Sequence, residues 1–455
     1  LRDGSDSSRP VFRTWLRRLR FSGGVMKFFR VPALVLALVL CCSPDARSEG
    51  FALNEWSARG VALSGGMVGR ADDVSTLAYN AAGITQVPGT HVMGGLAFIA
   101  PLGTIVADMG NGVEKHTSTK PDVWLAPHGF VSHQLNDRVW LGFASFSRFG
   151  LGNSFNSQWV GRYNMYDIGM QTVSFVPSLA YKVNDMLSLS VGVEALYAHV
   201  YMGNKIPTFN PAVSSERFDN DLQLEGSGWG VGAHLGMHMR FNDQWSLGLS
   251  YKSQITLNLF GDVDFGYEGP NGLITAGVMH GPQARDRSAN ATLQLPDSIA
   301  LGIAYKPLDN LSFEVGTVFT RWSTYNALNI NMGDDYSAIN NKEWRDGWNF
   351  NASVEYKPLD WWALRAGFAY ETPVVNESYS DYMMPTNGRT MMSLGTGFTW
   401  ENWTVDLTYA HLWINPVDYD HTETSGIRSP ASGIKGGHSE NVQANIYMFS
   451  VGYSF

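Results

Sequence analysis

The residues best placed to do chemistry are a few charged side chains within segments that alternate between bulky apolar and small residues. Between Trp362 and Tyr370 the bulky residues fall at alternate positions, which places Arg365 on the opposite face of a strand. A cation that faces an apolar pocket can bind the carboxylate of an amphiphilic molecule. The same alternation assigns five further charged residues to that opposite face: Glu194, Lys252, Glu314, Glu355 and Asp406.

The residue types and their spacing give little indication of a catalytic or metal-binding site. No Ser, His and acidic residues group beyond chance, and no histidines have the spacing of a metal site. Both cysteines, Cys41 and Cys42, lie in a segment interpreted below as a removed signal peptide. The mature chain then has no disulfide, cysteine nucleophile or thiolate metal site. We therefore predict a protein that is not an enzyme and needs no cofactor or metal.

Long alternating segments run from residue 91 to the C-terminus, separated by gaps that are in turn short and long. Asn, Asp and Pro, the residues of tight turns, mark six short gaps: 135–138, 182–185, 241–244, 306–310, 357–360 and 401–402. Seven long gaps lie near 101–122, 148–171, 202–221, 262–290, 323–345, 372–388 and 414–441. Such connections join fourteen antiparallel strands, and an even strand number with short turns on one side is typical of an outer-membrane barrel.

Two further patterns favour a transmembrane barrel over a soluble β-sandwich. The last strand has apolar residues at alternate positions and ends on Phe455, and it is expected to close the barrel against the strand near residue 91. Aromatic residues beside the short turns predict a girdle at the membrane interface: Trp140, Tyr181, Trp245, Tyr305, Tyr356, Trp361, Trp362, Trp400 and Trp403. Pro177 and Pro296 lie in strand-like segments and predict bulges, kinks or gaps in the wall, or shorter strands.

The N-terminal region carries a targeting signal. Residues 1–25 lack an initiating Met and are interpreted as an upstream mis-start. Residues 26–48 have a basic beginning, a short apolar run and a small-x-small end, which predicts a secretory signal peptide. The chain before residue 49 holds nine Lys and Arg but three acidic residues, so the mature chain is more acidic than the formal charge of −9. Nucleic acid is not expected to bind such a surface.

Residues 49–90 precede the first strand, do not alternate and are rich in Gly and Ala. A compact segment ahead of a barrel this wide predicts an internal plug, because the lumen would otherwise hold water. Three apolar residues of the plug, Phe51, Leu53 and Trp56, are candidates to line a ligand path. Loop residues are further candidates, since apolar side chains in loops and adaptable methionines suit such a path: Leu273, Ile274, Val278, Met279, Met383, Met384, Met391 and Met392.

Four stretches carry a family resemblance: GFALNE at 50–55, ADDVSTLAYNAAG at 71–83, LQLPDSIALGIAYKP at 293–307, and the terminal strand. They resemble the FadL family of outer-membrane long-chain fatty acid transporters and its relatives that import aromatic hydrocarbons. The resemblance covers essentially all of the mature chain. It implies a fourteen-stranded barrel with an N-terminal hatch, capture of hydrophobic ligand at extracellular loops, an internal site, and release through a hatch rearrangement and a lateral gap.

The most specific part of the resemblance is the hatch motif. The family has Asn-Pro-Ala where this chain has Asn80, Ala81 and Ala82, followed by Gly83. Loss of the proline removes a fixed φ angle, which puts a proline-specific kink in doubt but leaves the plug itself expected.

The charged residues predicted to face inward divide into candidates for salt bridges and candidates for ligand contacts. Glu314, Glu355, Arg365 and Asp406 lie near short turns, and this ring of mixed sign predicts salt bridges that hold the plug through Arg59 and Arg70 more than it predicts a ligand site. Lys252 lies nearer mid-barrel and is the better carboxylate partner. Arg321 and His199 lie near the extracellular ends of their strands, where an incoming carboxylate could meet them. The alternation of its strand, however, places His199 on the face that points toward lipid.

The sequence therefore predicts an all-β protein, with a plug at 49–90 and a transmembrane barrel at 91–455, that takes up hydrophobic molecules passively. Long-chain fatty acids are favoured because of Lys252 and Arg365. Aromatic or alkane hydrocarbons are the alternative substrates, and a general porin is a weaker alternative because a porin has no use for a plug. Expected partners are outer-membrane lipid, lipopolysaccharide, and the assembly machinery through the C-terminal strand, with the protein acting as a monomer.

Overall fold

The computed structural model describes residues 50–209, 217–266, 286–333, 337–385, 387–420, 427 and 431–455. The chain divides into two units, Leu1–Asp45 and Ala46–Phe455, and every described residue belongs to the second. The predicted mis-start and signal peptide lie outside the described residues, as do the predicted ligand-path residues Leu273, Ile274, Val278 and Met279.

The N-terminal residues form short helical elements: α3 (Ala58–Ala62), α4 (Thr76–Tyr79) and the 3-10 helix η1 (Ala81–Gln86). Ser57 begins α3, where its hydroxyl accepts from the Gly60 amide, and Asn80 begins η1 in the same way with the Ala82 amide. Helices this short are not stable alone, so packing against the rest of the protein must hold them. In the described part of the chain, no helix has the length and apolar character needed to cross a bilayer.

The rest of the described chain is built from strands. In chain order they are β1 (Thr90–Asp108), β2 (Glu114–Ser118), β3 (Trp124–Asn136), β4 (Val139–Phe146), β5 (Gly150–Ser154), β6 (Asp167–Lys182), β7 (Leu187–Phe209), β8 (Arg217–Arg240), β9 (Trp245–Lys252), β10 (Ile255–Asp264), β11 (Arg287–Leu295), β12 (Ser298–Leu308), β13 (Leu311–Thr320), β14 (Ala327–Asn331), β15 (Ser337–Asn341), β16 (Gly347–Leu359), β17 (Trp362–Glu371), β18 (Arg389–Trp400), β19 (Trp403–Ile414) and β20 (Gly436–Ser454). Two single turns of 3-10 helix, η3 (Trp322–Thr324) and η4 (Glu377–Tyr379), lie in the loops.

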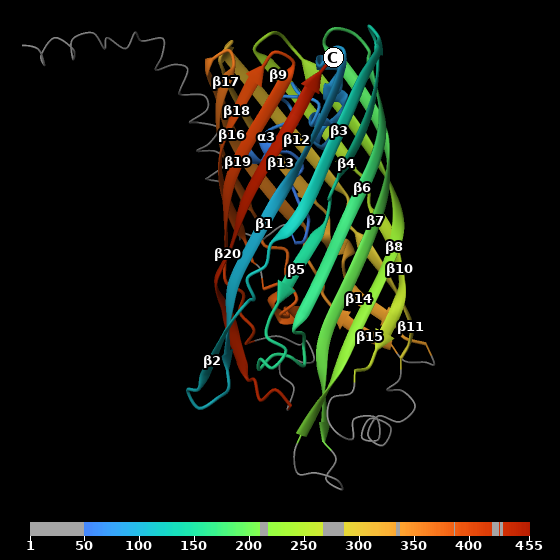
Figure 1. Ribbon diagram of the computed structural model, residues 1–455, viewed down its shortest axis with the longest axis vertical. Coiled ribbons are helices and arrows are strands. Elements are labelled where there is room, and N and C mark those ends of the chain that lie inside the picture. The colour runs from blue at the N-terminus through green and yellow to red at the C-terminus, as the bar shows by residue number, and fades with distance from the viewer. Residues whose placement is uncertain are drawn as a thin grey trace, which may run out of the picture. The chain divides into compact units, whose positions relative to one another are not determined.

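These strands form a closed antiparallel barrel whose wall has fourteen strands, as predicted. Five wall strands are each divided in two, as β4 with β5, β9 with β10, β11 with β12, β13 with β14, and β15 with β16 (Figure 1). β20 closes the wall against β1, from the pair of His91 with Ser454 to the pair of Asp108 with Gly436. Closure pairs the backbone of both terminal strands, which a lipid environment requires.

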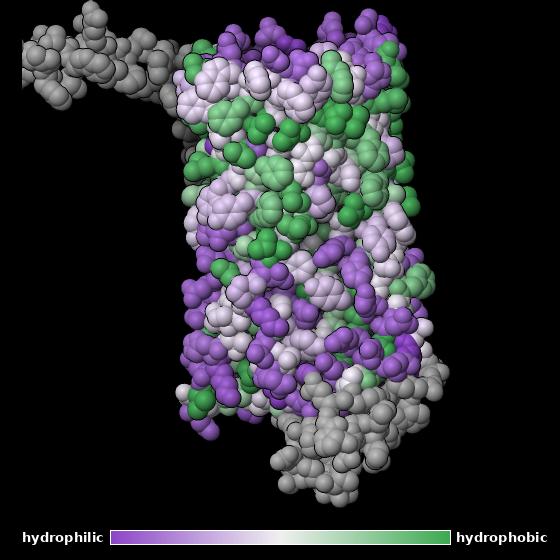
Figure 2. Space-filling model, in the orientation of Figure 1, coloured by the Kyte–Doolittle hydropathy of each residue, from purple (hydrophilic) through white to green (hydrophobic). Residues whose placement is uncertain are grey.

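Alternation along each strand separates an inner from an outer face. In β20 the inward residues Ile446, Met448 and Ser450 are buried, whereas Tyr447 and Phe449 are exposed. The charged residues predicted to face inward are all buried: Glu194, Lys252, Glu314, Glu355, Arg365 and Asp406. Figure 2 shows hydrophobic surface concentrated in the half of the barrel nearer the short turns, with hydrophilic surface at the turn rim and over the loop half.

The aromatic girdle is present, with one correction. Eight of the nine predicted residues have exposed or half-exposed side chains, and Trp245 stacks on Tyr305 with ring centroids 4.3 Å apart. Trp140, however, is 3% exposed and donates from its indole nitrogen to the carbonyl of Val87 in the N-terminal segment. Its inward direction follows from its even position in β4, whose outward residues are Leu141 and Phe143.

Several predicted loops are partly strand. β7 and β8 continue to Phe209 and from Arg217 as a paired ribbon, although 202–221 was predicted as loop. Beyond the bilayer the outer face of a strand meets water and other loops, so the apolar alternation that marks a transmembrane strand disappears there. Pro177 falls at a break in the β6–β7 ladder, and Pro296 lies in the break between β11 and β12, so both prolines do interrupt the wall.

Candidate functional site: the lumen and its plug

Residues 50–89, called the plug segment here, are held against inward-facing wall residues by ion pairs. Arg59 binds Glu355 in a bidentate arrangement, with Nε and Nη2 each donating to one carboxylate oxygen at 3.0 Å. Glu355 also accepts from Nε of Arg365 at 2.6 Å, and Arg365 reaches Asp406 at 2.5 Å. Arg365 therefore lies in the predicted salt-bridge network rather than at a free surface. Burial alone would lower the pKa of Arg59, but Asp72, Glu355 and Asp73 raise it well above its usual value, so this cation stays charged.

A second wall carboxylate binds the plug segment through its backbone. Glu314 on β13 accepts hydrogen bonds from the amides of Val68, Gly69 and Arg70, at 2.9, 3.0 and 2.7 Å. The carbonyl of Gly69 accepts in turn from His238 and from Ser246. Three consecutive amides around one carboxylate fix this stretch of the plug segment tightly, because charge-assisted hydrogen bonds are the stronger kind.

The hatch motif joins the plug segment to the wall. The side-chain amide of Asn80 donates to the carbonyl of Val68 at 3.0 Å and to that of Met237 on β8 at 2.9 Å. Ala81 is the first residue of η1, a position where a helix also accepts proline. At Gly83 an added Cβ would lie 2.3 Å from Cβ of Ala71, which explains the glycine.

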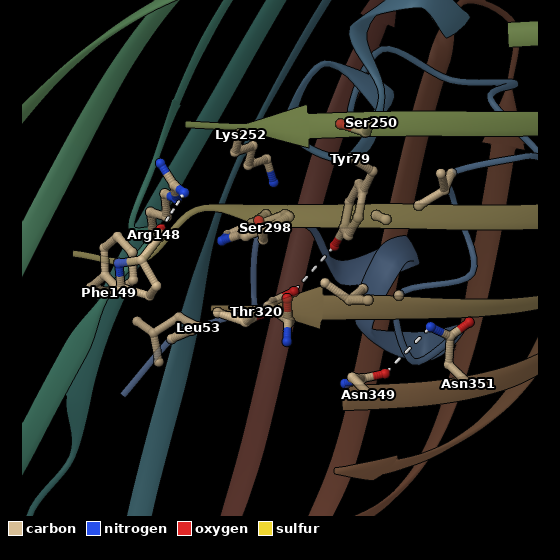
Figure 3. A pocket seen from close by; sticks show the side chains of 18 of the residues that line it. Leu53, Tyr79, Arg148, Phe149, Ser250, Lys252, Ser298, Thr320, Asn349 and Asn351 are labelled. Carbon is tan, nitrogen blue, oxygen red and sulfur yellow. Dashed lines mark hydrogen bonds between the residues drawn. The ribbon is translucent and has the colours of Figure 1, made fainter. Parts of the chain in front are cut away.

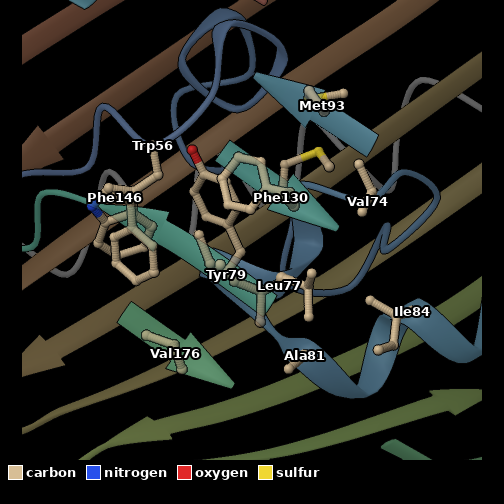
Figure 4. Packing of buried hydrophobic residues seen from close by; sticks show 14 of the residues in the cluster. Trp56, Val74, Leu77, Tyr79, Ala81, Ile84, Met93, Phe130, Phe146 and Val176 are labelled. Carbon is tan, nitrogen blue, oxygen red and sulfur yellow. The ribbon is translucent and has the colours of Figure 1, made fainter. Parts of the chain in front are cut away.

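Apolar packing adds to these polar contacts. Figure 4 shows Trp56, Leu77, Tyr79 and Ile84 of the plug segment among residues of the wall. The wall contributes Met93, Phe130, Trp140, Phe146 and Val176, and all of these residues are buried. Residues of the plug segment therefore pack directly against inward-facing residues of the wall.

The first residues of the plug segment contact a bend in the wall. Between β4 and β5 the chain turns inward, and Phe146, Arg148 and Phe149 are buried. The Leu53 amide donates to the Arg148 carbonyl and the Gly150 amide to the Phe51 carbonyl, both at 3.0 Å. This inward bend, residues 147–149, was not predicted, since 148–171 was read as loop.

The inward bend leaves a gap in the wall. β3 pairs with β4 only as far as Gly129 with Ser145, and β5 pairs with β6, so residues 124–128 of β3 have described ladder partners on β1 alone. A cavity with about 570 Å³ of unfilled space opens there, called the gap cavity. It is bordered by Leu102, Trp124 and Gly152 of the wall and by Met383 and Met384 of a loop.

A second cavity lies in the lumen between the plug segment and the wall, with about 670 Å³ of unfilled space (Figure 3). Arg148 and Lys252 reach into it, and this cavity is called the cationic cavity. None of the described residues that line it is Asp or Glu. Nζ of Lys252 lies 3.5 Å from the ring centroid of Trp56, a cation–π contact. Uncharged polar residues line much of the remainder: Asn54, Ser64, Tyr79, Ser250, Ser298, Thr320, Asn349 and Asn351.

The half of the lumen nearer the long loops has cavities lined mainly by apolar residues. Two adjoining cavities share Ile168, Val200, Leu259 and Leu328, and together they are called the apolar chamber. Phe51 lines the chamber and packs on Trp322 and Trp344, with ring centroids 4.7 and 5.6 Å away. One ion pair, Lys342 with Asp381, is buried at the chamber wall. Met383 and Met384 also line the chamber.

The predicted site residues thus separate into two groups. Phe51, Leu53, Trp56 and Lys252 line the cavities, together with Arg148 and Lys342, which sequence reasoning missed. The others lie elsewhere. Arg321 is exposed and pairs with Asp297 at 2.7 Å, and His199 lies on the outer face, 3.7 Å from Glu225. Met391 packs beside α3, and Met392 faces outward.

Arg148 and Lys342 were missed for a physical reason. Both lie where the wall strands are interrupted, so alternation, the only local signal for direction, does not reach them. The charged residue in SFSRFG at 145–150, an apolar stretch at a strand end, was the one available signal.

Comparison with known proteins agrees with this architecture. A long-chain fatty acid transport protein of Escherichia coli O6:H1 is 24% identical over 419 residues, covering 87% of this chain and 93% of that protein. Outer membrane protein P1 of Haemophilus influenzae is 22% identical, covering 94% of this chain and 100% of its own. The crystal structure of a Pseudomonas aeruginosa FadL homologue superposes with a TM-score of 0.77 at 20% identity, covering 90% of this chain and 100% of that one.

A toluene transporter gives a weaker match. The P. putida toluene transporter TodX has a TM-score of 0.62 at 14% identity, over 89% of this chain and 99% of that chain. The family model described as outer membrane protein transport protein (OMPP1/FadL/TodX) matches residues 39–455. The chain therefore belongs to the OMPP1/FadL/TodX family of outer-membrane transport proteins.

Proposed function

We propose that the protein takes up long-chain fatty acids or closely similar hydrophobic carboxylates across the outer membrane. One observation carries the proposal: Lys252 reaches into the cationic cavity beside Arg148, which pairs with the buried Glu194 at 2.8 Å, and no described residue that lines the cavity is acidic. A carboxylate in a lumen shielded from water needs such a partner, whereas a hydrocarbon needs only the pocket. The apolar chamber suits the tail of the same molecule, since Phe51, Tyr325 and Trp344 line it.

The route that this arrangement supports has three stages. Ligand enters the apolar chamber beneath the loop that carries Met383 and Met384. Its carboxylate then meets Lys252 in the cationic cavity, and the molecule leaves sideways through the gap cavity beside Trp124. The plug segment shapes this path, because Leu53 and Trp56 line the cationic cavity and Phe51 lines the chamber.

Equilibrium binding of oleate and of methyl oleate to the purified protein tests the proposal. The two ligands share a tail and differ in charge, so we expect oleate to bind about tenfold more tightly, which corresponds to about 1.4 kcal/mol. Lys252→Ala should weaken the binding of oleate by a similar factor and leave the affinity for methyl oleate unchanged. Lys306→Ala is the matched control, because Lys306 is exposed at a short turn and pairs with Asp309.

The competing hypothesis is a hydrocarbon channel, favoured by the many apolar residues that line the chamber. Equal affinity for oleate and its methyl ester, together with tight binding of toluene, would support that reading and reject the carboxylate proposal.

A further inference from the structure

On three neighbouring strands, β10, β11 and β14, the usual alternation of the wall is inverted. Leu259 on β10, Leu293 on β11 and Leu328 on β14 point inward and line the apolar chamber. The outward residues of the same strands are mostly amides and hydroxyls, and they are exposed. The chamber explains the inward face of these strands, and the outward face needs a separate explanation.

The register of the strands arranges six exposed outward residues in two rows across β10, β11 and β14. The rows are Asn258, Thr292 and Asn329, and Phe260, Asn290 and Asn331, together called the amide face. Neighbouring strands lie about 4.8 Å apart and the two rows about 6.7 Å apart, a spacing comparable to the size of a sugar ring.

The composition of the amide face suits sugar hydroxyls. None of its six residues is charged, and a side-chain amide offers both donors and an acceptor, as a hydroxyl requires. Thr292 donates to Oδ1 of Asn258 at 3.1 Å, and Oδ1 of Asn331 accepts from the Gly333 amide at 2.9 Å, so neither bond uses the N–H donors of these amides. Phe260, which is 69% exposed, provides a flat apolar surface on which a sugar ring can lie.

The amide face lies directly beyond the hydrophobic surface that Figure 2 shows nearer the short turns, called the apolar belt here. Figure 1 places β10, β11 and β14 in the half of the barrel with the long loops, which is the extracellular half in this fold. Trp229 on β8 pairs with Asn258, is 56% exposed, and is an aromatic residue of the kind found at a membrane interface. The rows therefore begin where the bilayer ends.

A cation lies at the same boundary. Arg321 follows β13 directly, donates to Asp297 at 2.7 Å and to Gln254 at 3.4 Å, and keeps 47% of its side chain exposed. Arginine at the level of the headgroups is a suitable partner for a lipid phosphate. Apolar belt, cation and amide face thus follow one another outward, in the order of the acyl chains, phosphates and sugars of lipopolysaccharide.

We propose that the amide face binds the saccharide part of lipopolysaccharide in the outer leaflet, with a lipid A phosphate at Arg321 and the acyl chains on the apolar belt. The inference goes beyond the proposed function and does not depend on it, because the amide face lies outside the lumen. Lipopolysaccharide bound there would brace the wall of the apolar chamber, since Leu259 and Leu293 belong to the same strands.

Equilibrium binding to the purified protein in detergent micelles tests the proposal. The probes are lipopolysaccharide with a complete core saccharide, phosphatidylglycerol, and the soluble core saccharide released from the same lipopolysaccharide. We expect wild-type protein to bind lipopolysaccharide at least tenfold more tightly than either of the other two. Phosphatidylglycerol shares the charge and the acyl chains but has no sugar, and the soluble saccharide has no lipid.

The double variant Asn258→Ala with Asn329→Ala should weaken lipopolysaccharide binding about tenfold and leave phosphatidylglycerol binding unchanged. Phe260→Ala is a second, independent variant that should weaken lipopolysaccharide binding in the same direction. Gln171→Ala with Thr390→Ala is the matched control, because it removes two outward polar side chains on β6 and β18. Heat-dependent mobility in gel electrophoresis verifies that each variant is folded, independently of any ligand.

Three results would overturn the proposal. The first is lipopolysaccharide affinity that is the same in wild type, the double variant and Phe260→Ala. The second is phosphatidylglycerol binding as tight as that of lipopolysaccharide, which would show that charge and acyl chains suffice. The third is equally tight binding of the soluble saccharide, which would assign the amide face to a free glycan instead. Failure of the protein to bind oleate would reject the proposed function and leave this test unaffected.

Discussion

At the scale of single residues, polar side chains inside the lumen decide how the plug segment sits. Asn80 makes two side-chain donations, to Val68 and Met237, and begins η1 through its oxygen. The family resemblance singled out this motif from sequence, and its bonds to the wall give it a structural role. Lys252 was likewise predicted to face inward, whereas Arg148 was not, because its direction depends on contacts with residues far away in the sequence.

Asn80→Ala should lower the free energy of unfolding by about 2–3 kcal/mol, because two buried carbonyls lose their donor and η1 loses its cap. Denaturant titration of the purified protein in lipid measures this loss. Asn290→Ala is the control, since Asn290 is exposed on β11 and should change stability by less than about 0.5 kcal/mol. A loss no larger than that of the control would contradict the anchoring role.

Glu55 in the plug segment gives a pH dependence. Burial raises the pKa of this carboxyl, while Arg389 opposes the shift. The unfolded chain ionises at the ordinary value of about 4.3, so the folded state loses stability as pH rises from that value through the raised one. Glu55→Gln should remove this loss and make the protein more stable than wild type at neutral pH. Unfolding free energies of both proteins across this pH range decide the matter, and parallel curves would refute the assignment.

At the scale of elements, local sequence signals determine the wall strands, whereas contacts between distant parts of the chain determine the inward bend. The wall strands follow from alternation and turn residues, both local signals, which is why fourteen strands and six short turns could be predicted. The inward bend at 147–149 could not, because it is fixed by bonds to Leu53, Trp56, Ser253 and Pro296 rather than by its own sequence. The paired ribbon of β7 and β8 was also missed, since alternation ends where the membrane ends.

Wall carboxylates should hold the plug segment without being needed for the barrel. Glu314→Ala removes the acceptor for three consecutive amides, and we expect plug docking to weaken by about 3 kcal/mol or more. Ion conductance in planar bilayers should rise relative to wild type, while the barrel stays folded because its ladders are untouched. Glu225→Ala, which removes an exposed outer carboxylate, is the matched control. Conductance equal to the control would show that Glu314 does not hold the plug segment.

At the scale of the whole molecule, the barrel is an outer-membrane fold, and residues 50–89 pack against its inward-facing side chains. The apolar chamber lies at the loop end, the cationic cavity lies between the plug segment and the wall, and the gap cavity lies beside β3. A general porin would conduct small solutes through an open lumen, and this arrangement does not favour it. The order of the three cavities instead suits a molecule with a long apolar tail and one negative charge.

Uptake of oleate by cells that lack their own long-chain fatty acid transporter tests the central claim most directly. Cells that express the wild-type protein should take up oleate faster than cells with an empty vector, and Lys252→Ala should reduce this gain while Lys306→Ala preserves it. Oleate uptake no faster than the empty vector, with toluene uptake raised by the same wild-type protein, would contradict the claim that the lumen carries hydrophobic carboxylates.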